Sequence, residues 1–567
     1  MRHTLGWAAY PLAVAFAIGL AACGGASSHK PSGNAGGHQG GTTIVLAPAN
    51  PGTADPALNT GTLWSQLIDT NDGLVAFNKV GGVQGTKIVA DLATSLPTPS
   101  DGGRTYAFQI RRGIRYSNGT MLKASDFKNV FDRMFKVNGP TTGTFYSGIV
   151  GAARCLKHAS TCDLSKGVVA NDSTGTVTFH LSQPDPEFLD KLALPYAFAV
   201  PPSAPNKDVG TNPLPGTGPY KFVQYTPNQQ MQLARNPYFK PWSVAAQPPG
   251  YPNRMLIKFG LSLEADVTQV ENNQADGILS TTGLPTDRLN EISTRFASQT
   301  HVDPVPAIFY MALNTRVAPF DDVRVRQALN YATDRNAAVK IVGGPRLAVP
   351  SCQILPPNFP GYQEYCPFAT NPAAGGRGAW TGPDMAKAKQ LISASHTKGM
   401  KVTIVNPNVP LGQSTGLYFV SLLNQLGYRA SLKQLAPAVQ DPLVKNSANK
   451  VQMSFQVWYL DYPAASDFLN VLTGCGSFHP NSDANQNVAE FCNSKIQSDM
   501  SRALSVQLTN PNAANQLWAR VDQEVTNQAP EIVMFNPKVV NFVSKRVKNF
   551  VANPQWQWLI DQSWVQR

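Results

Sequence analysis

Hydrophobic residues recur along this chain with two periods, one typical of strands and one typical of helices. Alternating runs predict strands at four places: 43–46, 106–110, 176–181 and 401–405. Apolar residues spaced three and four apart predict helices, two of which start near Ser125-Asp126 and near Asp321-Asp322. Two more helices are predicted, one through 417–426 that stops at Gly427, and one that ends before Pro530. Strands and helices alternate over the whole length, which predicts an α/β architecture.

The first 22 residues have a different pattern and predict export. Arg2 supplies a positive start, and the apolar stretch 8–20 is too short to span a bilayer as a stable helix. Small residues then precede Cys23, as in the lipobox of bacterial lipoproteins, where the cysteine becomes the lipidated first residue. The Gly/Ser-rich segment 24–41 reads as a flexible tether. We therefore expect a signal peptide over 1–22 and a lipid anchor at Cys23 on the extracytoplasmic face of a bacterial cell membrane. The alternative is an ordinary secretory signal in which Cys23 is incidental.

Six cysteines remain after Cys23, and an exported protein lies where disulfides persist. They could pair in about fifteen ways. We predict the three local pairings because each lies in a segment rich in polar or turn-forming residues: Cys155–Cys162, Cys352–Cys366 and Cys475–Cys492. Metal binding is the alternative, since His158 and His479 lie close to cysteines. Neither group has a fourth ligand nearby, so we expect no metal and no cofactor.

Charge and composition narrow the possible partners. The 567 residues include 47 Lys+Arg and 35 Asp+Glu, a net charge of +12, yet only 14% are charged. No run of five or six basic residues occurs, which argues against a nucleic-acid groove. A hydrophobic fraction of 42% supports large packed cores rather than disorder.

Three segments in a fixed order carry a family resemblance. They are 106–127 (YAFQIRRGIRYSNGTMLKASDF), 216–220 (GTGPY) followed by Arg235-Asn236-Pro237, and 314–335, which contains PFDDVRVRQAL. Together they resemble the extracellular solute-binding proteins of family 5, which include the oligopeptide and dipeptide receptors of ABC importers. By themselves the segments supply turns, helix caps and internal ion contacts. The glycines of GTGPY precede a strand and lack the Lys-Ser/Thr of a P-loop, so we interpret them as a structural turn rather than a phosphate site.

The resemblance implies two lobes around a cleft that closes on a solute. The first lobe would comprise about 42–305, with a subdomain inserted at about 75–195, and the segment 530–567 would return to it. The second lobe would be 306–529. The implied function is capture of short peptides by a monomer and delivery to an ABC permease in the cytoplasmic membrane, with no chemistry performed.

The same resemblance implies a ligand site in the segment WYLDY. In peptide receptors an aspartate of this segment pairs with the ligand's α-ammonium group, and by that match the partner is Asp461, with Trp458 and Tyr459 lining the cleft. A carboxylate in a partly dry cleft makes a charge-assisted bond to an ammonium. The alternative is that Asp461 bonds its own turn backbone, as aspartates commonly do.

Two rival functions remain open. The sequence GQSTG at 412–416 fits the G-x-S-x-G pattern of serine hydrolases, with Ser414 as nucleophile. The preceding strand ends near Val405, too far back for a nucleophile elbow, and we expect Ser414 to be the N-cap of the next helix. The other rival is a receptor for an oligosaccharide, a metal chelate, an opine or a signalling peptide, or a lipoprotein retained for adhesion or signalling.

Overall fold

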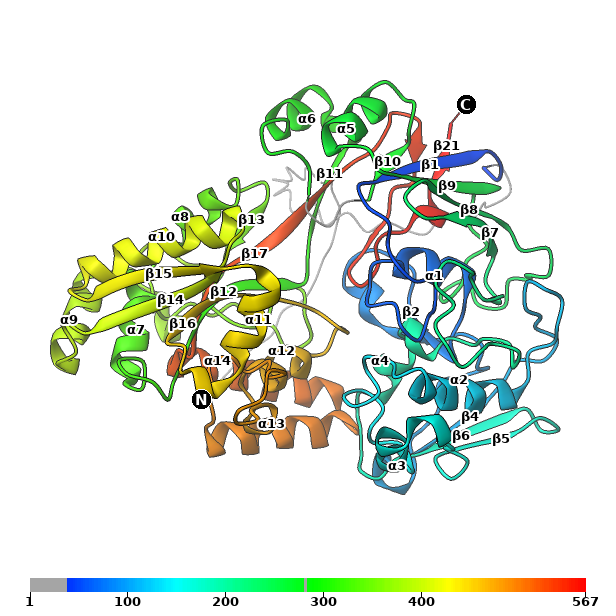
Figure 1. Ribbon diagram of the computed structural model, residues 1–567, viewed down its shortest axis with the longest axis horizontal. Coiled ribbons are helices and arrows are strands. Elements are labelled where there is room, and N and C mark those ends of the chain that lie inside the picture. Colours follow the sequence, from blue (N-terminus) through cyan, green and yellow to red (C-terminus); the bar gives the residue numbers. More distant parts are fainter. Residues whose placement is uncertain (1–37, 280–282, 567) are drawn as a thin grey trace, which may run out of the picture. The chain divides into compact units, whose positions relative to one another are not determined.

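Two large sheets organise the chain, and each gathers strands that are far apart in the sequence (Figure 1). The structure, a computed structural model, describes residues 38–279 and 283–566. Every helix and strand that it describes belongs to the unit formed by residues 39–567. Both sheets mix strands with covering helices, as the alternating pattern predicts.

The first sheet has five strands in the order β10-β1-β9-β8-β7. Their bounds are Gly277–Ile278 for β10, Thr42–Ala47 for β1, Arg254–Phe259 for β9, Gln230–Arg235 for β8 and Tyr220–Thr226 for β7. β1 is the strand expected at 43–46, and it pairs in parallel with both β9 and β10. Helices α5 (Leu263–Glu271) and α6 (Leu289–Arg295) follow along the chain.

A second group of elements lies between β1 and β7 in the sequence and has its own hydrophobic core. Its strands are β2 (Val75–Phe77) with β3 (Ile88–Ala90), and β4 (Thr105–Gln109), β6 (Thr176–His180) and β5 (Val168–Asn171). Its helices, with α1 at the start, are α1 (Trp64–Thr70), α2 (Ala124–Lys136), α3 (Ala152–Lys157) and α4 (Phe188–Leu192). β4 and β6 match the strands predicted at 106–110 and 176–181, to within a residue at each end.

The second large sheet is built around the long strand β17 (Glu531–Phe542). Its order is β11-β17-β12-β16-β14-β15, with β13 also paired to β17. The other bounds are Thr300–Pro304 (β11), Ala307–Leu313 (β12), Ala348–Pro350 (β13), Lys401–Pro407 (β14), Arg429–Leu435 (β15) and Met453–Tyr459 (β16). One part of β17 pairs with β12 and β13, and the rest pairs with β11.

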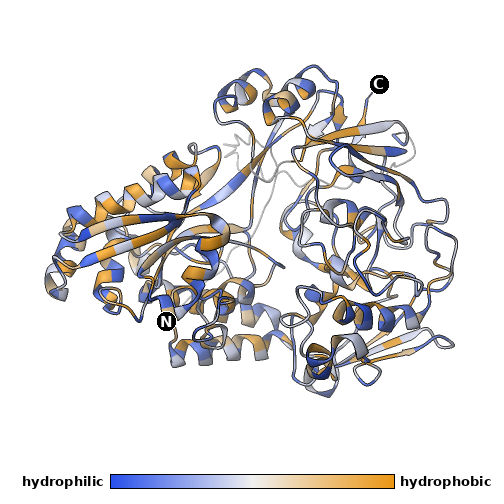
Figure 2. Ribbon diagram, in the orientation of Figure 1, coloured by the Kyte–Doolittle hydropathy of each residue, from blue (hydrophilic) through white to orange (hydrophobic). Residues whose placement is uncertain are grey.

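Helices bury both faces of this second sheet. On one face, core residues of β12, β14 and β16 pack with α7 (Val323–Ala332), α8 (Arg335–Ile341), α9 (Met385–Ser395) and α10 (Pro410–Gln425). On the other, β12 packs with α12 (Ala465–Thr473), α13 (Ser494–Gln507) and α14 (Pro511–Gln528), while α11 (Pro437–Lys445) contacts β14. Hydrophobic and hydrophilic residues alternate along these helices (Figure 2), as expected where one side faces the core.

One predicted helix start is confirmed to within two residues, and one predicted helix cap is wrong. The helix expected to start at Ser125-Asp126 begins at Ala124, and Lys123 is its N-cap residue. Asp126 still closes this end, because its carboxylate accepts the Lys123 backbone N–H at 3.0 Å. Ser414 is not an N-cap, because α10 begins at Pro410 after the N-cap residue Val409. Proline is favoured at the first helical position, a stronger start signal than a serine four residues later.

The family-like segments serve the fold, as interpreted from sequence. A side chain at Gly216 or Gly218 would collide with backbone carbonyls of α1, so both positions require glycine. Between them, the Thr217 hydroxyl donates to buried Asp72. In the third segment, Arg335 is fully buried and donates to the carbonyl oxygens of Ser351, Val533 and Asn330.

Six cysteines form disulfides in the three local pairings: Cys155–Cys162, Cys352–Cys366 and Cys475–Cys492. Their sulfurs are therefore not free thiolates for a metal. Cys23 and the predicted signal peptide and tether up to residue 37 lie outside the described residues. Within the described part of the chain, no helix combines the length and apolar character needed to cross a membrane.

Candidate functional site

The loop between β16 and α12 places Asp461 at the centre of the candidate site. Asp461 follows the end of β16 by two residues. Its backbone N–H and its carbonyl oxygen both form hydrogen bonds to side chains. Its N–H donates to the Asp467 carboxylate at 2.9 Å, and its carbonyl oxygen accepts the Gln555 side-chain amide at 2.9 Å. Asp467 lies in the first turn of α12, where a carboxylate is favoured by the helix dipole. The loop is therefore fixed by its backbone, and the Asp461 side chain is left for other use.

The Asp461 carboxylate has no hydrogen-bond donor among the described residues. Burial raises the pKa of Asp461 to about 6, because a carboxylate loses water there without gaining a partner. The charge of Asp461 also contributes, after burial, to the raised pKa of the Tyr196 hydroxyl, which places the two groups close together. Asp467, and not Asp461, is the residue that bonds the turn backbone.

Trp458 and Tyr459 lie on opposite faces of β16, because successive side chains of a strand alternate. Trp458 is opposite Ile308 and packs against the core on the α12 and α14 side. Tyr459 is 50% exposed, and its ring meets that of Phe309 edge-on at 6.1 Å. The strand therefore presents one of the two predicted aromatic residues to solvent and buries most of the other.

The same loop contacts the group of elements between β1 and β7. The buried carboxylate of Glu187 accepts hydrogen bonds from the Tyr462 hydroxyl, at 3.2 Å, and from the Ser466 hydroxyl. Tyr462 packs edge-on against Phe145 at 5.6 Å, and the Lys191 ammonium lies 5.8 Å from the Tyr462 ring centre. The loop that carries Asp461 is thus clamped between α12 and the residues around α4.

Several carboxylates share this region with few cations. Burial, followed by the charge of Asp461, raises the pKa of Asp467. Burial also raises the pKa of Glu187, and burial with the charge of Glu187 raises that of Asp190 to about 8. Lys191, paired with Asp185 at 2.7 Å, is the cation that lowers the pKa of both. The region therefore favours the arrival of positive charge.

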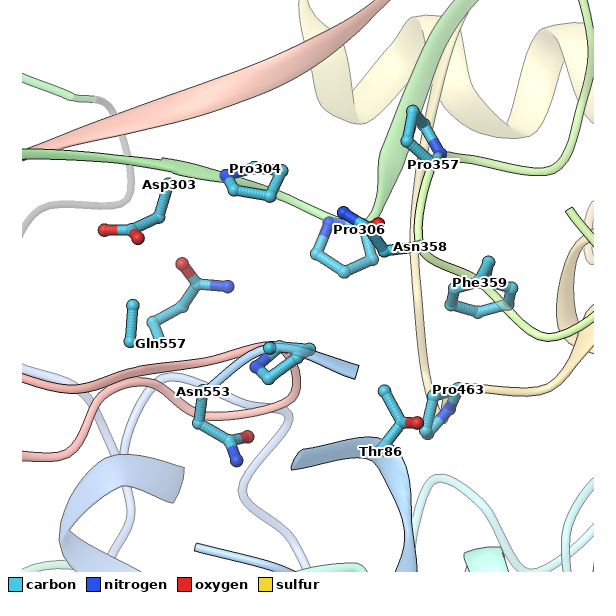
Figure 3. Close-up of a pocket in the computed structure, with 13 residues that line it drawn as sticks. Thr86, Asp303, Pro304, Pro306, Pro357, Asn358, Phe359, Pro463, Asn553 and Gln557 are labelled. Carbon is cyan, nitrogen blue, oxygen red and sulfur yellow. The ribbon is translucent and has the colours of Figure 1, made fainter. Parts of the chain in front are cut away.

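A cavity of about 250 Å³ lies beside this loop (Figure 3). Its walls come from four main segments: 303–306, 357–359, Pro463 and 552–557. Proline supplies much of this wall, and proline rings offer no N–H donor. Asp303 is the ionisable residue among the described lining residues, and its carboxylate accepts the Asn541 amide at 3.2 Å. Asp461, Trp458 and Tyr459 do not line this cavity, which the loop reaches through Pro463.

Sequence reasoning missed Glu187, Tyr196 and Gln555, which surround the Asp461 loop from distant parts of the chain. None lies in a recognisable motif, and a glutamate after Pro184-Asp185-Pro186 is typical of an exposed turn. Their roles depend on tertiary contacts with residues more than 90 positions away. Ser414, the residue of the hydrolase alternative, is exposed in the second turn of α10 and does not sit at a strand-to-helix elbow.

Comparisons with known proteins find relatives over most of the chain. A family model described as bacterial extracellular solute-binding proteins, family 5 Middle, matches residues 87–480. The probable deoxycholate-binding periplasmic protein YgiS of Escherichia coli K12 is 27% identical over 522 residues, covering 89% of this chain and 90% of that protein. The glutathione-binding protein GsiB of Salmonella choleraesuis SC-B67 is 24% identical, over 82% of this chain and 84% of that protein.

Solved structures show the same fold. Clavulanic acid biosynthesis oligopeptide binding protein 2 superposes with a TM-score of 0.82 at 23% identity, covering 94% of this chain and 96% of that one. The Helicobacter pylori periplasmic binding protein DppA in complex with the peptide STSA superposes with a TM-score of 0.68 at 19% identity, covering 94% and 99%. The fold is therefore the two-lobed α/β fold of periplasmic binding proteins, as the sequence resemblance implies.

Proposed function

Because the chain belongs to the bacterial extracellular solute-binding proteins of family 5, we propose that it captures short peptides beside Asp461 and delivers them to an ABC permease. The observation that carries this proposal is the Asp461 carboxylate, which is partly exposed, loses much of its hydration in the fold and accepts no hydrogen bond from the described residues. Buried carboxylates are costly unless a cation or several donors compensate them. A peptide's α-ammonium group supplies both a charge and three donors.

The surrounding groups favour the same ligand chemistry. The raised pKa values of Asp467, Glu187 and Asp190 mean that further negative charge is unfavourable in this region, so a cationic ligand group is favoured over an anionic one. The Asp461 backbone is already held by Asp467 and Gln555, so the carboxylate needs little reordering when the ligand arrives. The ammonium end of the peptide would therefore bind at a preorganised anion.

Cys23 would hold this receptor at the membrane. Its position after small residues and before the 24–41 tether supports lipidation, although these residues lie outside the described part of the chain. One acyl chain gives only marginal binding, so stable anchoring requires more than one. Mass spectrometry of the N-terminal peptide from the membrane fraction tests this directly: a diacylated or triacylated Cys23 is expected, and an unmodified one would refute the anchor.

A second ligand class has one observation in its favour. YgiS, the relative with 27% identity, is named for deoxycholate rather than for a peptide. An amphiphilic solute without an amine is therefore the alternative. It would leave the Asp461 carboxylate without its proposed partner, so its binding is expected to be insensitive to that residue.

A ligand panel separates the two classes. Purified protein is titrated calorimetrically with di- to hexapeptides, the same peptides acetylated at the amino end, glutathione and deoxycholate. Free peptides are expected to bind and to raise the melting temperature by mass action, whereas acetylated peptides lose most of their affinity. Equal binding of free and acetylated peptides would remove Asp461 as the amine partner. Binding of deoxycholate alone would replace the peptide proposal with the amphiphile.

A further inference from the structure

A second cavity, of about 300 Å³, lies at the ends of the first sheet and has an unusual lining. Tryptophans 64, 556 and 558 line it together with apolar residues such as Met231 and Phe259. Of the described residues in its walls, none is acidic, basic or a histidine. This separates it from the proline-rich cavity, which contains Asp303, and from the acidic region around Asp461.

The tryptophans are held in place by their own polar groups. The Trp64 indole N–H donates to the Asn59 carbonyl oxygen at 3.1 Å, and that of Trp558 donates to the Ser563 hydroxyl at 2.9 Å. Trp64 and Trp556 meet edge-on at 5.9 Å. With those two N–H groups occupied elsewhere, their rings offer a rigid apolar surface to the cavity.

Two glutamines add unsatisfied polar groups to this lining. Gln66 is 4% exposed, and its side-chain Nε2 has no hydrogen-bond partner within the described residues. Gln555 is 8% exposed, and its Oε1 likewise has no partner there. Both residues line the cavity, although these two atoms are themselves buried, so the polar part of the lining is uncharged.

The cavity is connected to Asp461 by two sets of contacts. Gln555 lines the cavity and also donates to the Asp461 carbonyl oxygen. Trp64 also lines the cavity, and its ring packs edge-on at 5.5 Å against that of Tyr196. The charge of Asp461 contributes, after burial, to the raised pKa of the Tyr196 hydroxyl. A ligand whose ammonium group is at Asp461 therefore has this cavity within its reach.

We propose that the tryptophan-lined cavity is a specificity pocket for a large uncharged side chain of the bound ligand, aromatic or branched aliphatic. This rests on the proposed function, since it takes the ligand to be a peptide. About 150 Å³ of apolar cavity is enough to bind benzene, so this one has room for a larger ring. A charged side chain would lose its water there and find no counter-ion.

A positional peptide scan tests the pocket. Tetra-alanine is synthesised with Phe, Glu or Lys at one position at a time, and each peptide is titrated calorimetrically against the full-length protein. At one position we expect Phe to bind at least about tenfold more tightly than Glu or Lys, the effect of burying an aromatic side chain. Peptides that bind with no such preference at any position overturn the pocket and leave peptide capture intact. If no peptide binds, both proposals fail.

Three variants locate the preference within the protein. Trp556→Ala is expected to bring the Phe peptide within about threefold of the Ala peptide. Gln66→Glu places a carboxylate in the lining and is expected to improve the Lys peptide relative to Phe at that position. Gln425→Leu, at an exposed residue of α10, is the control and keeps the preference. A full Phe preference in Trp556→Ala, or no gain for Lys in Gln66→Glu, contradicts the proposal. The Gln66→Glu result tests the pocket even if Trp556→Ala fails to fold.

Discussion

Two regions of this molecule bury several carboxylates around one lysine, and they differ in how those carboxylates are satisfied. In the Lys79 cluster, the buried ammonium donates to Gln247 at 2.6 Å and lies near Asp69 and Asp561, while Asp72 and Asp91 accept from neighbouring side chains. In the Asp461 cluster (Asp461, Asp467, Glu187 and Asp190), Asp461 accepts no bond from the described residues. Burial raises pKa values in both clusters, so burial alone does not identify a binding carboxylate. Asp461 combines a missing donor with partial exposure, whereas the buried Asp266 carboxylate also lacks a donor but is closed off from a ligand.

The strongest test of this contrast removes the lysine of the first cluster. Lys79→Met leaves several buried carboxylates without their shared cation, and breaking a buried pair typically lowers the free energy of unfolding by about 3–5 kcal/mol. Urea denaturation of the unliganded protein measures the change. Lys495→Met, at a residue whose side chain is 71% exposed, is the matched control and should leave the midpoint unchanged. A stable Lys79→Met protein would show that these carboxylates are protonated and need no cation.

The second prediction is a loss of peptide binding without a loss of stability, the opposite of what Lys79→Met tests. Asp461→Asn is expected to weaken peptide binding by about 2–5 kcal/mol, which is about 30-fold or more, because the ammonium loses its counter-ion. The unliganded variant should be at least as stable as the wild type, since the change removes a desolvated charge. Calorimetry and urea denaturation measure the two quantities.

Asp441→Asn is the matched control for this variant. Its carboxylate is 56% exposed and pairs with Lys445 within α11. It is expected to bind peptide like the wild type. If Asp461→Asn unfolds easily and still binds peptide, then Asp461 is a structural residue, and the contrast between the clusters disappears.

The pH dependence sharpens the contrast further. The pKa of Asp461 in the unliganded protein is about 6, so below that pH the carboxyl group is mostly protonated. An ammonium group binds the ionised carboxylate, so peptide binding at low pH must first remove this proton. Affinity for a free peptide should therefore be about tenfold lower at pH 5 than at pH 8. The carboxyl pKa is raised in the folded protein, so its contribution to unliganded stability is present at low pH and is lost as pH rises from about 4 to 6.

Calorimetry at several pH values measures this effect, and Asp461→Asn is its control. The variant has no group to titrate at that position, so its weak residual affinity should change little between pH 5 and 8. A wild-type affinity that is constant over this range would mean that Asp461 is ionised throughout or takes no part in binding.

The last prediction concerns Glu187, the partner that joins the Asp461 loop to the residues around α4. Glu187→Ala leaves the Tyr462 and Ser466 hydroxyls without this acceptor and should lower stability by about 1–3 kcal/mol. Glu187→Gln keeps an acceptor oxygen and should cost clearly less. Thermal unfolding of both variants measures the difference. Equal effects of the two would show that the charge of Glu187, rather than its acceptor geometry, holds the loop.

Much of the fold could be predicted from the sequence because the relevant signals are local. The strands at 106–110 and 176–181 have clean alternation, and Val325, Ala328, Leu329 and Ala332 are all buried on α7 as their spacing indicates. The local disulfide pairings are also those expected. The start of α10 was predicted wrongly because two helix-start signals lie close together, Pro410 and Ser414, and the helix begins at the proline.

The site was predictable only in part. The resemblance pointed to Asp461, but it did not reveal the residues that distinguish a free carboxylate from a satisfied one. Asp467 lies six residues away and takes the backbone-capping role that sequence alone allowed for Asp461. Glu187 and Gln555 reach the loop from 275 and 94 residues away. Such contacts depend on how elements pack, and no local pattern encodes them.

The strand β17 has a mechanical consequence. Between Glu531 and Phe535 it is hydrogen-bonded to β12, and from Lys538 to Phe542 it is hydrogen-bonded to β11. Its residues Val539 and Asn541 line the tryptophan-lined cavity, and its partner β11 lines the proline-rich one. A ladder paired along its length resists sharp bending, but a two-stranded ribbon twists easily. The β11–β17 ribbon is therefore expected to twist more easily than the rest of this sheet, and residues of its strands line both cavities.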